Sequence, residues 1–124
     1  MLRRISIIAF GLCFLLMIAV PDQEKNNPSY EKDVSPIIGK YCLPCHLSDN
    51  ENPSGLALDD FGMLIEGGEH GDIVEAGKPE ESLLYQKLQD DPPFGKRMPR
   101  NKKKLSAEEI RTIYVWIQKG AKEK

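Results

Sequence analysis

Basic residues are not in excess in this sequence. Of 124 residues, 17 are Lys or Arg and 19 are Asp or Glu, which gives a formal net charge of −2 at pH 7. Without residues 1–21, which contain two arginines and no acid, 15 basic residues face 19 acidic ones, and the net charge is −4. Because nucleic-acid-binding domains usually carry a basic surface, this balance argues against nucleic acid as a partner.

Cysteine and histidine are also scarce, with three and two residues respectively. Cys13 lies in an apolar N-terminal run, so only Cys42 and Cys45 remain, which excludes a framework of several disulfides. A structural zinc site needs four ligands, and beyond these two thiols the chain offers only His46 and the distant His70. No β-strand pattern precedes Cys42, which disfavours a thioredoxin-like dithiol.

The first 21 residues have the layout of a secretory signal. Arg3 and Arg4 precede the uncharged run 5–20, as in a basic start followed by an apolar core. The cleavage site is poorly formed, because Ala19 could precede the cut but the bulky Met17 lies two positions earlier. A membrane anchor is therefore the alternative: 16 residues span roughly 24 Å as a helix, short of the hydrocarbon thickness of about 30 Å.

Both alternatives predict an exported protein, periplasmic and either soluble or anchored to the cytoplasmic membrane through residues 5–20. Lipid attachment at Cys13 is disfavoured, because Leu12 is not the small residue that would precede a lipidated cysteine. The polar residues 22–29 predict a linker. Residues 30–124 then form one small domain.

Five consecutive residues, Cys42-Leu43-Pro44-Cys45-His46, form a C-x-x-C-H motif, the attachment signature of a c-type haem. Cysteines three apart share one face of a helix, so both thiols can reach the two vinyl groups of one porphyrin. The adjacent His46 is then the proximal iron ligand. A simple Cys42–Cys45 disulfide would leave His46 unexplained. The motif thus predicts one covalently bound haem.

Hydrophobic periodicity predicts a helix on each side of the domain. Val34, Ile37, Ile38 and Tyr41 form an apolar stripe, and the helix, capped at Ser35, is expected to run into the motif and include Cys45. The last helix is marked by a capping box and a C-terminal glycine (Ser106, Glu109, Gly120) and by a matching stripe (Ile110, Ile113, Tyr114, Ile117). We expect the two helices to pack on each other, with Trp116 in the core.

Two further helices are expected between them. A short one begins at Asp59 and is broken by the glycines at 67, 68 and 71. These glycines lack the spacing and preceding strand of a phosphate-binding loop, so they predict a turn. Another helix begins near Pro79 and continues to the residues before Asp91.

Three side chains are candidates for the second axial position of the iron: Met63, His70 and Met98. Met63 lies in a predicted helix, where Met usually fills space, and His70 lies in the glycine turn. Met98 is favoured because it lies in a loop before the last helix, next to Pro99. An open axial site remains an alternative.

The chain resembles a small monohaem cytochrome c of the planctomycete type. The matching segments are VSPIIGKYCLPCH (34–46), SGLALDDFGMLIEGGEHG (54–71), GKPEESLLYQKL (77–88), RMPR (97–100) and LSAEEIRTIYVWIQKGA (105–121). The resemblance implies an all-α, cytochrome c-like fold of about four short helices wrapped round one haem. It also implies Cys42 and Cys45 as attachment residues, His46 as the proximal ligand and Met98 as the distal ligand.

Two functions follow from such a domain. The first is a carrier of single electrons between separate donor and acceptor proteins, and not an enzyme. The alternative is a haem enzyme or sensor with an open site, such as a small peroxidase or gas binder. Six basic residues surround Met98 without an acid among them and could steer an acidic partner: Lys96, Arg97, Arg100, Lys102, Lys103 and Lys104.

Overall fold

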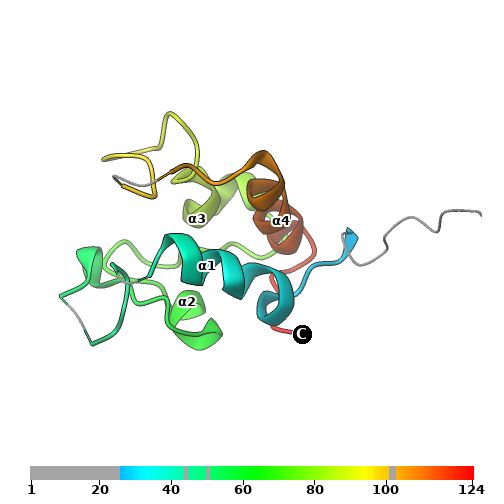
Figure 1. Ribbon diagram of the computed structural model, residues 1–124, viewed down its shortest axis with the longest axis horizontal. Helices are drawn as coiled ribbons and strands as arrows, with labels where there is room; N and C mark the ends of the chain where they lie inside the picture. Colours follow the sequence, from blue (N-terminus) through cyan, green and yellow to red (C-terminus); the bar gives the residue numbers. More distant parts are fainter. Residues whose placement is uncertain (1–25, 44, 50, 101–102) are drawn as a thin grey trace, which may run out of the picture.

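The computed structural model describes residues 26–43, 45–49, 51–100 and 103–124 (Figure 1). These residues form helices and loops, and the one β-type pairing among them is an isolated bridge between Gly68 and Gly71. The all-α prediction is therefore confirmed for this part of the chain. The predicted leader lies outside the described residues. Within them, no helix has the length and apolar character that crossing a membrane requires.

The first helical segment begins earlier than predicted. A π-helical turn, η2 (Tyr30–Val34), continues directly into α1 (Ser35–Tyr41). Ser29 caps this segment, because its hydroxyl accepts the backbone N–H of Lys32. The prediction that Ser35 is the cap is therefore wrong.

The same segment ends before the C-x-x-C-H motif. Helix α1 stops at Tyr41, and Cys42 caps it by donating its N–H to the carbonyl of Ile38 at 2.8 Å. The predicted extension of the helix through Cys45 is wrong. The sequence supplies a reason, since Pro44 has no N–H with which to continue the hydrogen-bond ladder.

Helix α2 (Phe61–Glu66) confirms the short helix predicted after Asp59. Asp60 caps it, its carboxylate accepting a backbone N–H of the first turn at 2.9 Å. Gly67, with φ of +77°, ends the helix. Gly68 and Gly71 then exchange two backbone hydrogen bonds, of 3.2 and 2.9 Å. The glycines form a turn, as predicted.

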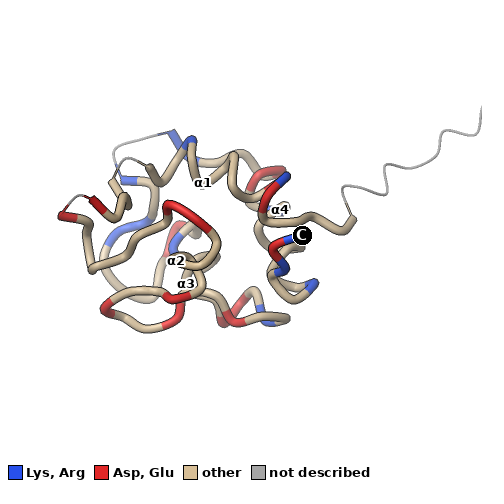
Figure 2. The backbone as a smooth tube through the Cα atoms, turned by 90° about the horizontal axis from the view of Figure 1, so that it is seen from below, with Lys and Arg blue, Asp and Glu red and all other residues tan. Residues whose placement is uncertain are grey.

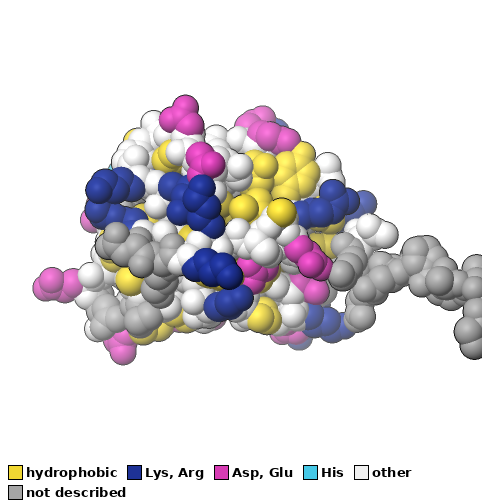
Figure 3. Space-filling view, turned by 45° about the horizontal axis from the view of Figure 1, so that its top comes forward, with side chains coloured by type: hydrophobic (Ala, Val, Ile, Leu, Met, Phe, Trp, Pro, Cys, Tyr) yellow, Lys and Arg dark blue, Asp and Glu magenta, His cyan; other side chains and the backbone are white. Residues whose placement is uncertain are grey.

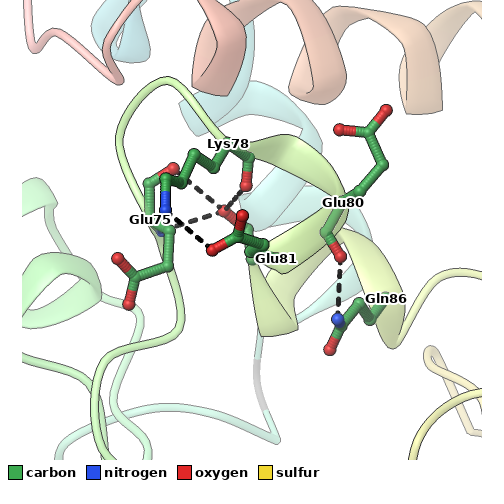
Figure 4. Close-up of polar contacts among 6 residues, drawn as sticks. Glu75, Lys78, Glu80, Glu81 and Gln86 are labelled. Atoms are coloured by element: carbon green, nitrogen blue, oxygen red, sulfur yellow. Dashed lines mark hydrogen bonds and ion pairs between the residues drawn. The ribbon is translucent and has the colours of Figure 1, made fainter.

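The third predicted helix is interrupted. It consists of a 3-10 turn, η4 (Pro79–Glu81), and a short helix, α3 (Leu83–Gln86). Ser82 separates them with an extended backbone, and it is fully buried. Its hydroxyl donates to the carbonyl of Lys78 at 2.9 Å and accepts the N–H of Glu75 at 2.8 Å. Figure 4 shows this polar cluster around the turn.

Helix α4 (Ala107–Gln118) has the predicted start. The Ser106 hydroxyl accepts the Glu109 N–H at 3.1 Å, and the Glu109 carboxylate accepts the Ser106 N–H at 2.8 Å. Trp116 is fully buried and donates its indole N–H to the carbonyl of Lys122 at 2.8 Å. Both the capping box and the core position of Trp116 are confirmed.

Glu109 also joins the last helix to the first. Its carboxylate accepts hydrogen bonds from the Tyr41 hydroxyl at 2.8 Å and from Lys40 Nζ at 3.0 Å. Partial burial acts to raise the pKa of Glu109, but hydrogen bonds from its helix cap, Lys40 and Tyr41 outweigh burial and lower the pKa to about 2. The first and last helices therefore pack together, as predicted.

The helices and the two ends of the described part of the chain lie toward one side of the molecule, and two long loops lie toward the other (Figure 1). The backbone N–H of Tyr30 donates to the carbonyl of Lys122 at 3.1 Å, so the C-terminal residues run beside η2. The largest fully buried apolar side chains come from both ends of the chain and from α2: Val34, Ile38, Leu64, Ile113, Trp116 and Ile117. This core lies among the helices, so the side of the molecule formed by the loops can contain a cavity.

Candidate functional site

A cavity of about 540 Å³ lies among the loops and the helix ends. Its volume is within the range of roughly 300–1,000 Å³ that is typical of ligand and cofactor sites. Segments distant in sequence line it, from residues 41–46, 53–58, 68–73, 83–88 and 94–105. Four predicted site residues are among the lining residues: Cys42, Cys45, His46 and Met98.

His46 is held by both its side chain and its backbone. Its Nδ1 lies 3.0 Å from the carbonyl oxygen of Leu56, directly after the 3-10 turn η3 (Pro53–Gly55). Because a carbonyl can only accept, Nδ1 carries the proton and Nε2 of the neutral ring keeps its lone pair. The carbonyl of His46 also accepts the N–H of Leu58 at 2.8 Å. A metal-ligating histidine usually has such a partner on its other nitrogen.

Both cysteines line the cavity together with His46. Cys42 directly follows α1, and Cys45 lies in the turn after it. Cys42 is half-buried and Cys45 is exposed, and no disulfide joins them. The N–H of His46 donates to the carbonyl of Cys42 at 3.2 Å, which closes the motif into a single turn. A turn, and not the predicted helix, therefore brings the two thiols and the imidazole to the same cavity.

Met98 is anchored through its backbone to the helix across the loop. Its N–H donates to the carbonyl of Lys87 at 2.7 Å, and its carbonyl accepts Nη1 of Arg97 at 3.1 Å. The Met98–Pro99 peptide is cis, and Pro99 is buried. These contacts hold a half-buried Met98 in the cavity wall.

The other two candidates for the distal ligand differ from each other. Met63 lies in α2 and does not line the cavity, whereas His70 does. His70 is exposed, and its ring contacts that of Phe94 with centroids 4.6 Å apart. The structure therefore places Met98 and His70 at the cavity together with the C-x-x-C-H residues.

The charged side chains in the cavity wall are basic. Among the described residues that line it, none is acidic, and Lys87 and Arg100 are the two Lys or Arg side chains. Lys87 Nζ donates to the carbonyl of Phe94 at 2.6 Å and lies 4.7 Å from the centre of its ring. Burial, and then the charge of Arg100, lower the pKa of Lys87.

The rest of the wall fits a large apolar macrocycle. Its chemistry combines two thiols, an imidazole with an available nitrogen and a thioether, which are the groups that attach and ligate a haem c. Between them lie aliphatic side chains that would contact the porphyrin: Leu56, Leu58, Ile73, Leu83, Leu84, Leu88 and Leu105. The residues present therefore fit haem.

Sequence reasoning missed three contributors to this site. The carbonyl of Leu56 orients His46, and the carbonyl of Lys87 holds Met98. A backbone carbonyl is present in every residue, so neither role leaves a signal in the sequence. Phe94 could have been noticed, because it is a large aromatic residue beside glycine and proline in an otherwise polar loop, and it remains exposed in the structure.

The basic segment around Met98 is partly neutralised. Asp90 pairs with Arg97, whose Nε lies 3.7 Å from its carboxylate, and with Lys104. Lys96, Arg100 and Lys103 are exposed, and Lys102 lies outside the described residues. Figure 2 shows Lys and Arg distributed along the chain together with Asp and Glu, and on the face drawn in Figure 3 several Lys and Arg side chains are exposed with acidic side chains among them. The sequence alone did not show that an acid from outside the segment joins it.

Comparisons with known proteins give one match. No curated protein and no solved structure matches the chain. Residues 42–101 match the family described as planctomycete cytochrome C, a match that begins at the first cysteine of the motif and extends past Met98. The planctomycete-type cytochrome c domain suspected from the sequence is thereby confirmed as a match over these residues.

Proposed function

We propose that the protein is an exported c-type cytochrome that carries single electrons on one covalently bound haem. The observation that carries this proposal is the cavity in which Cys42, Cys45, His46 and Met98 meet. Bound haem supplies an iron that exchanges one electron at a time. The two thiols would attach it, and His46 Nε2 and the Met98 sulfur would be its axial ligands.

The chain's own contribution is to fix the positions of these groups. The Leu56 carbonyl holds the imidazole of His46 in one tautomer, and the Lys87 carbonyl holds the Met98 loop. If His46 and Met98 both ligate the iron, no position would remain there for a substrate. The arrangement therefore supports electron transfer and not catalysis.

Export is part of the proposal and is supported by the sequence. Arg3 and Arg4 followed by the apolar residues 5–20 favour a secretory signal, and retention of that segment would tether the domain to the membrane. An exported domain meets donor and acceptor proteins outside the cytoplasm.

A haem enzyme or sensor with an open site is the second candidate. Its support is His70, which lines the cavity and could act as an acid or base there. Binding of carbon monoxide by the reduced wild-type protein would favour this candidate over the carrier.

The proposal is tested by covalent haem attachment. Produced in a host with a haem-maturation system, the wild-type protein is expected to stay red after acid–acetone extraction, with its mass increased by one haem. Cys42→Ser and Cys45→Ser should each weaken this retention, because each removes one thioether. Cys13→Ser is the control and should retain haem fully. A folded but colourless wild-type protein from such a host would contradict the proposal.

We further propose that the exposed basic residues near Met98 attract an acidic redox partner. Lys96 and Lys103 carry the proposal, because Asp90 already pairs with their respective neighbours Arg97 and Lys104. Electrostatic steering raises association rates by roughly 10- to 1,000-fold, and its range is a Debye length of about 10 Å at 0.1 M salt.

Small oxidants of opposite charge can test this surface. Oxidation of the reduced protein by anionic ferricyanide should slow as salt increases, whereas oxidation by a cationic cobalt complex should not. Lys96→Glu and Lys103→Glu should slow the ferricyanide reaction severalfold at low salt. Lys119→Glu, at an exposed position after α4, makes the same charge change away from the cavity and should have little effect. Equal effects of all three variants would overturn the assignment of the surface.

A further inference from the structure

The cavity carries a positive charge that the proposed iron ligation does not explain. The chain as a whole has more acidic than basic residues. Yet the described residues of the cavity wall include Lys87 and Arg100 and no Asp or Glu. An apolar cavity of this kind favours a ligand that is apolar over most of its surface and anionic at a few points.

Neither cation has a carboxylate partner in the described part of the chain. The neighbouring Arg97 and Lys104 differ in this respect, because both pair with Asp90. Lys87 is half-buried and donates to the carbonyl of Phe94, a neutral acceptor that leaves the charge uncompensated. Lys87 is half-buried and Arg100 is exposed at the rim of the same cavity, and anionic groups of a bound ligand would compensate both charges.

We infer that Lys87 and Arg100 bind the two carboxylates of the haem, an assignment that rests on the proposed function. The cofactor matches the wall in both respects, because its ring is apolar and its two carboxylates are anionic. A protein partner fits less well, since Lys87 is half-buried and its ammonium is directed to the Phe94 carbonyl. Lys87 and Arg100 are thus positioning residues for the cofactor.

This assignment links the carboxylates to the distal loop. The carbonyl of Lys87 accepts the N–H of Met98 while its side chain faces the cavity, and Arg100 follows Met98 by two residues. The residues that hold the carboxylates therefore belong to the same structure that holds the proposed iron ligand. A neighbouring cation lowers the pKa of a carboxyl group by about 1–3 units, so both carboxylates would stay ionised.

The test is the pH dependence of the reduction potential in the haem-loaded protein. Ionisation of a haem carboxyl appears as a bend in that dependence, and its apparent pKa should rise by about one unit or more in Lys87→Gln and in Arg100→Gln, because each removes a cation. The midpoint potential should also fall, since a nearby positive charge favours the reduced iron. Lys87→Arg keeps the charge and should restore both values.

Lys119→Gln is the matched control, because it removes one positive charge at an exposed position outside the cavity. Repeating the titrations at 1 M salt, where the Debye length is about 3 Å, should remove any effect of the control and preserve those of Lys87→Gln and Arg100→Gln. Haem-loaded Lys87→Gln and Arg100→Gln proteins with the wild-type bend would overturn the inference and leave the proposed function intact. Absence of covalent haem in the wild-type protein would overturn both.

Discussion

Met98→Ala is expected to give a reduced protein that binds carbon monoxide and has a much lower reduction potential than the wild type. Removing the thioether opens one axial position of the iron, and Met opposite His raises the potential. Axial ligands vary haem potentials over about 0.8 V, so a fall on the order of 0.1 V or more is expected. Potentiometry and the carbon monoxide difference spectrum measure the two effects.

Met63→Ala is the matched control, because it deletes the same side chain from α2, outside the cavity wall. It should leave the potential and the carbon monoxide spectrum unchanged. His70→Ala tests the remaining candidate for the distal ligand, since His70 does line the cavity. Carbon monoxide binding that appears in His70→Ala and not in Met98→Ala would assign the distal position to His70.

The sequence predicts those parts of the fold that depend on neighbouring residues. The capping box of α4 is one example, because Ser106 and Glu109 satisfy each other's backbone N–H within one turn. The glycine turn after α2 is another, since Gly67 and Gly71 both adopt positive φ, which favours glycine. In both cases the residues within one turn were enough to predict the feature.

The break in the third predicted helix was not predictable in this way. Ser82 interrupts the third predicted helix because a buried hydroxyl binds backbone groups of Glu75 and Lys78, which belong to the preceding loop. Without these partners, Ser82 is an ordinary residue between two good helical segments. The conformation of the preceding loop overrides helix propensity here.

The same division applies to the candidate site. The spacing of Cys42, Cys45 and His46 identifies the motif by residue type alone. The partners that orient it are a carbonyl ten residues later, at Leu56, and for Met98 a carbonyl eleven residues earlier, at Lys87. Such contacts depend on how the loops meet, and residue types do not encode that directly.

Gly67→Ala is expected to destabilise the domain by about 2–6 kcal/mol. The residue has φ of +77° and ψ of −152°, a backbone region that is essentially restricted to glycine, and an L-residue there costs about 1–3 kcal/mol. A Cβ at position 67 would also lie 2.2 Å from the carbonyl oxygen of Gly71, so the backbone of the turn must move. Overpacking of this kind adds about 1–3 kcal/mol. Urea unfolding of the haem-loaded protein measures the change.

Gly77→Ala isolates the contribution of the close approach. Gly77 has a similar φ of +84°, but no atom lies within 4 Å of the position its Cβ would take. Strain alone then predicts a loss of about 1–2 kcal/mol. Because Gly68 and His70 of the same turn line the cavity, Gly67→Ala should also broaden the haem spectrum, and Gly77→Ala should not. Equal losses in the two variants would mean that the turn relaxes at no cost and that the contact between Gly67 and Gly71 does not fix this wall of the cavity.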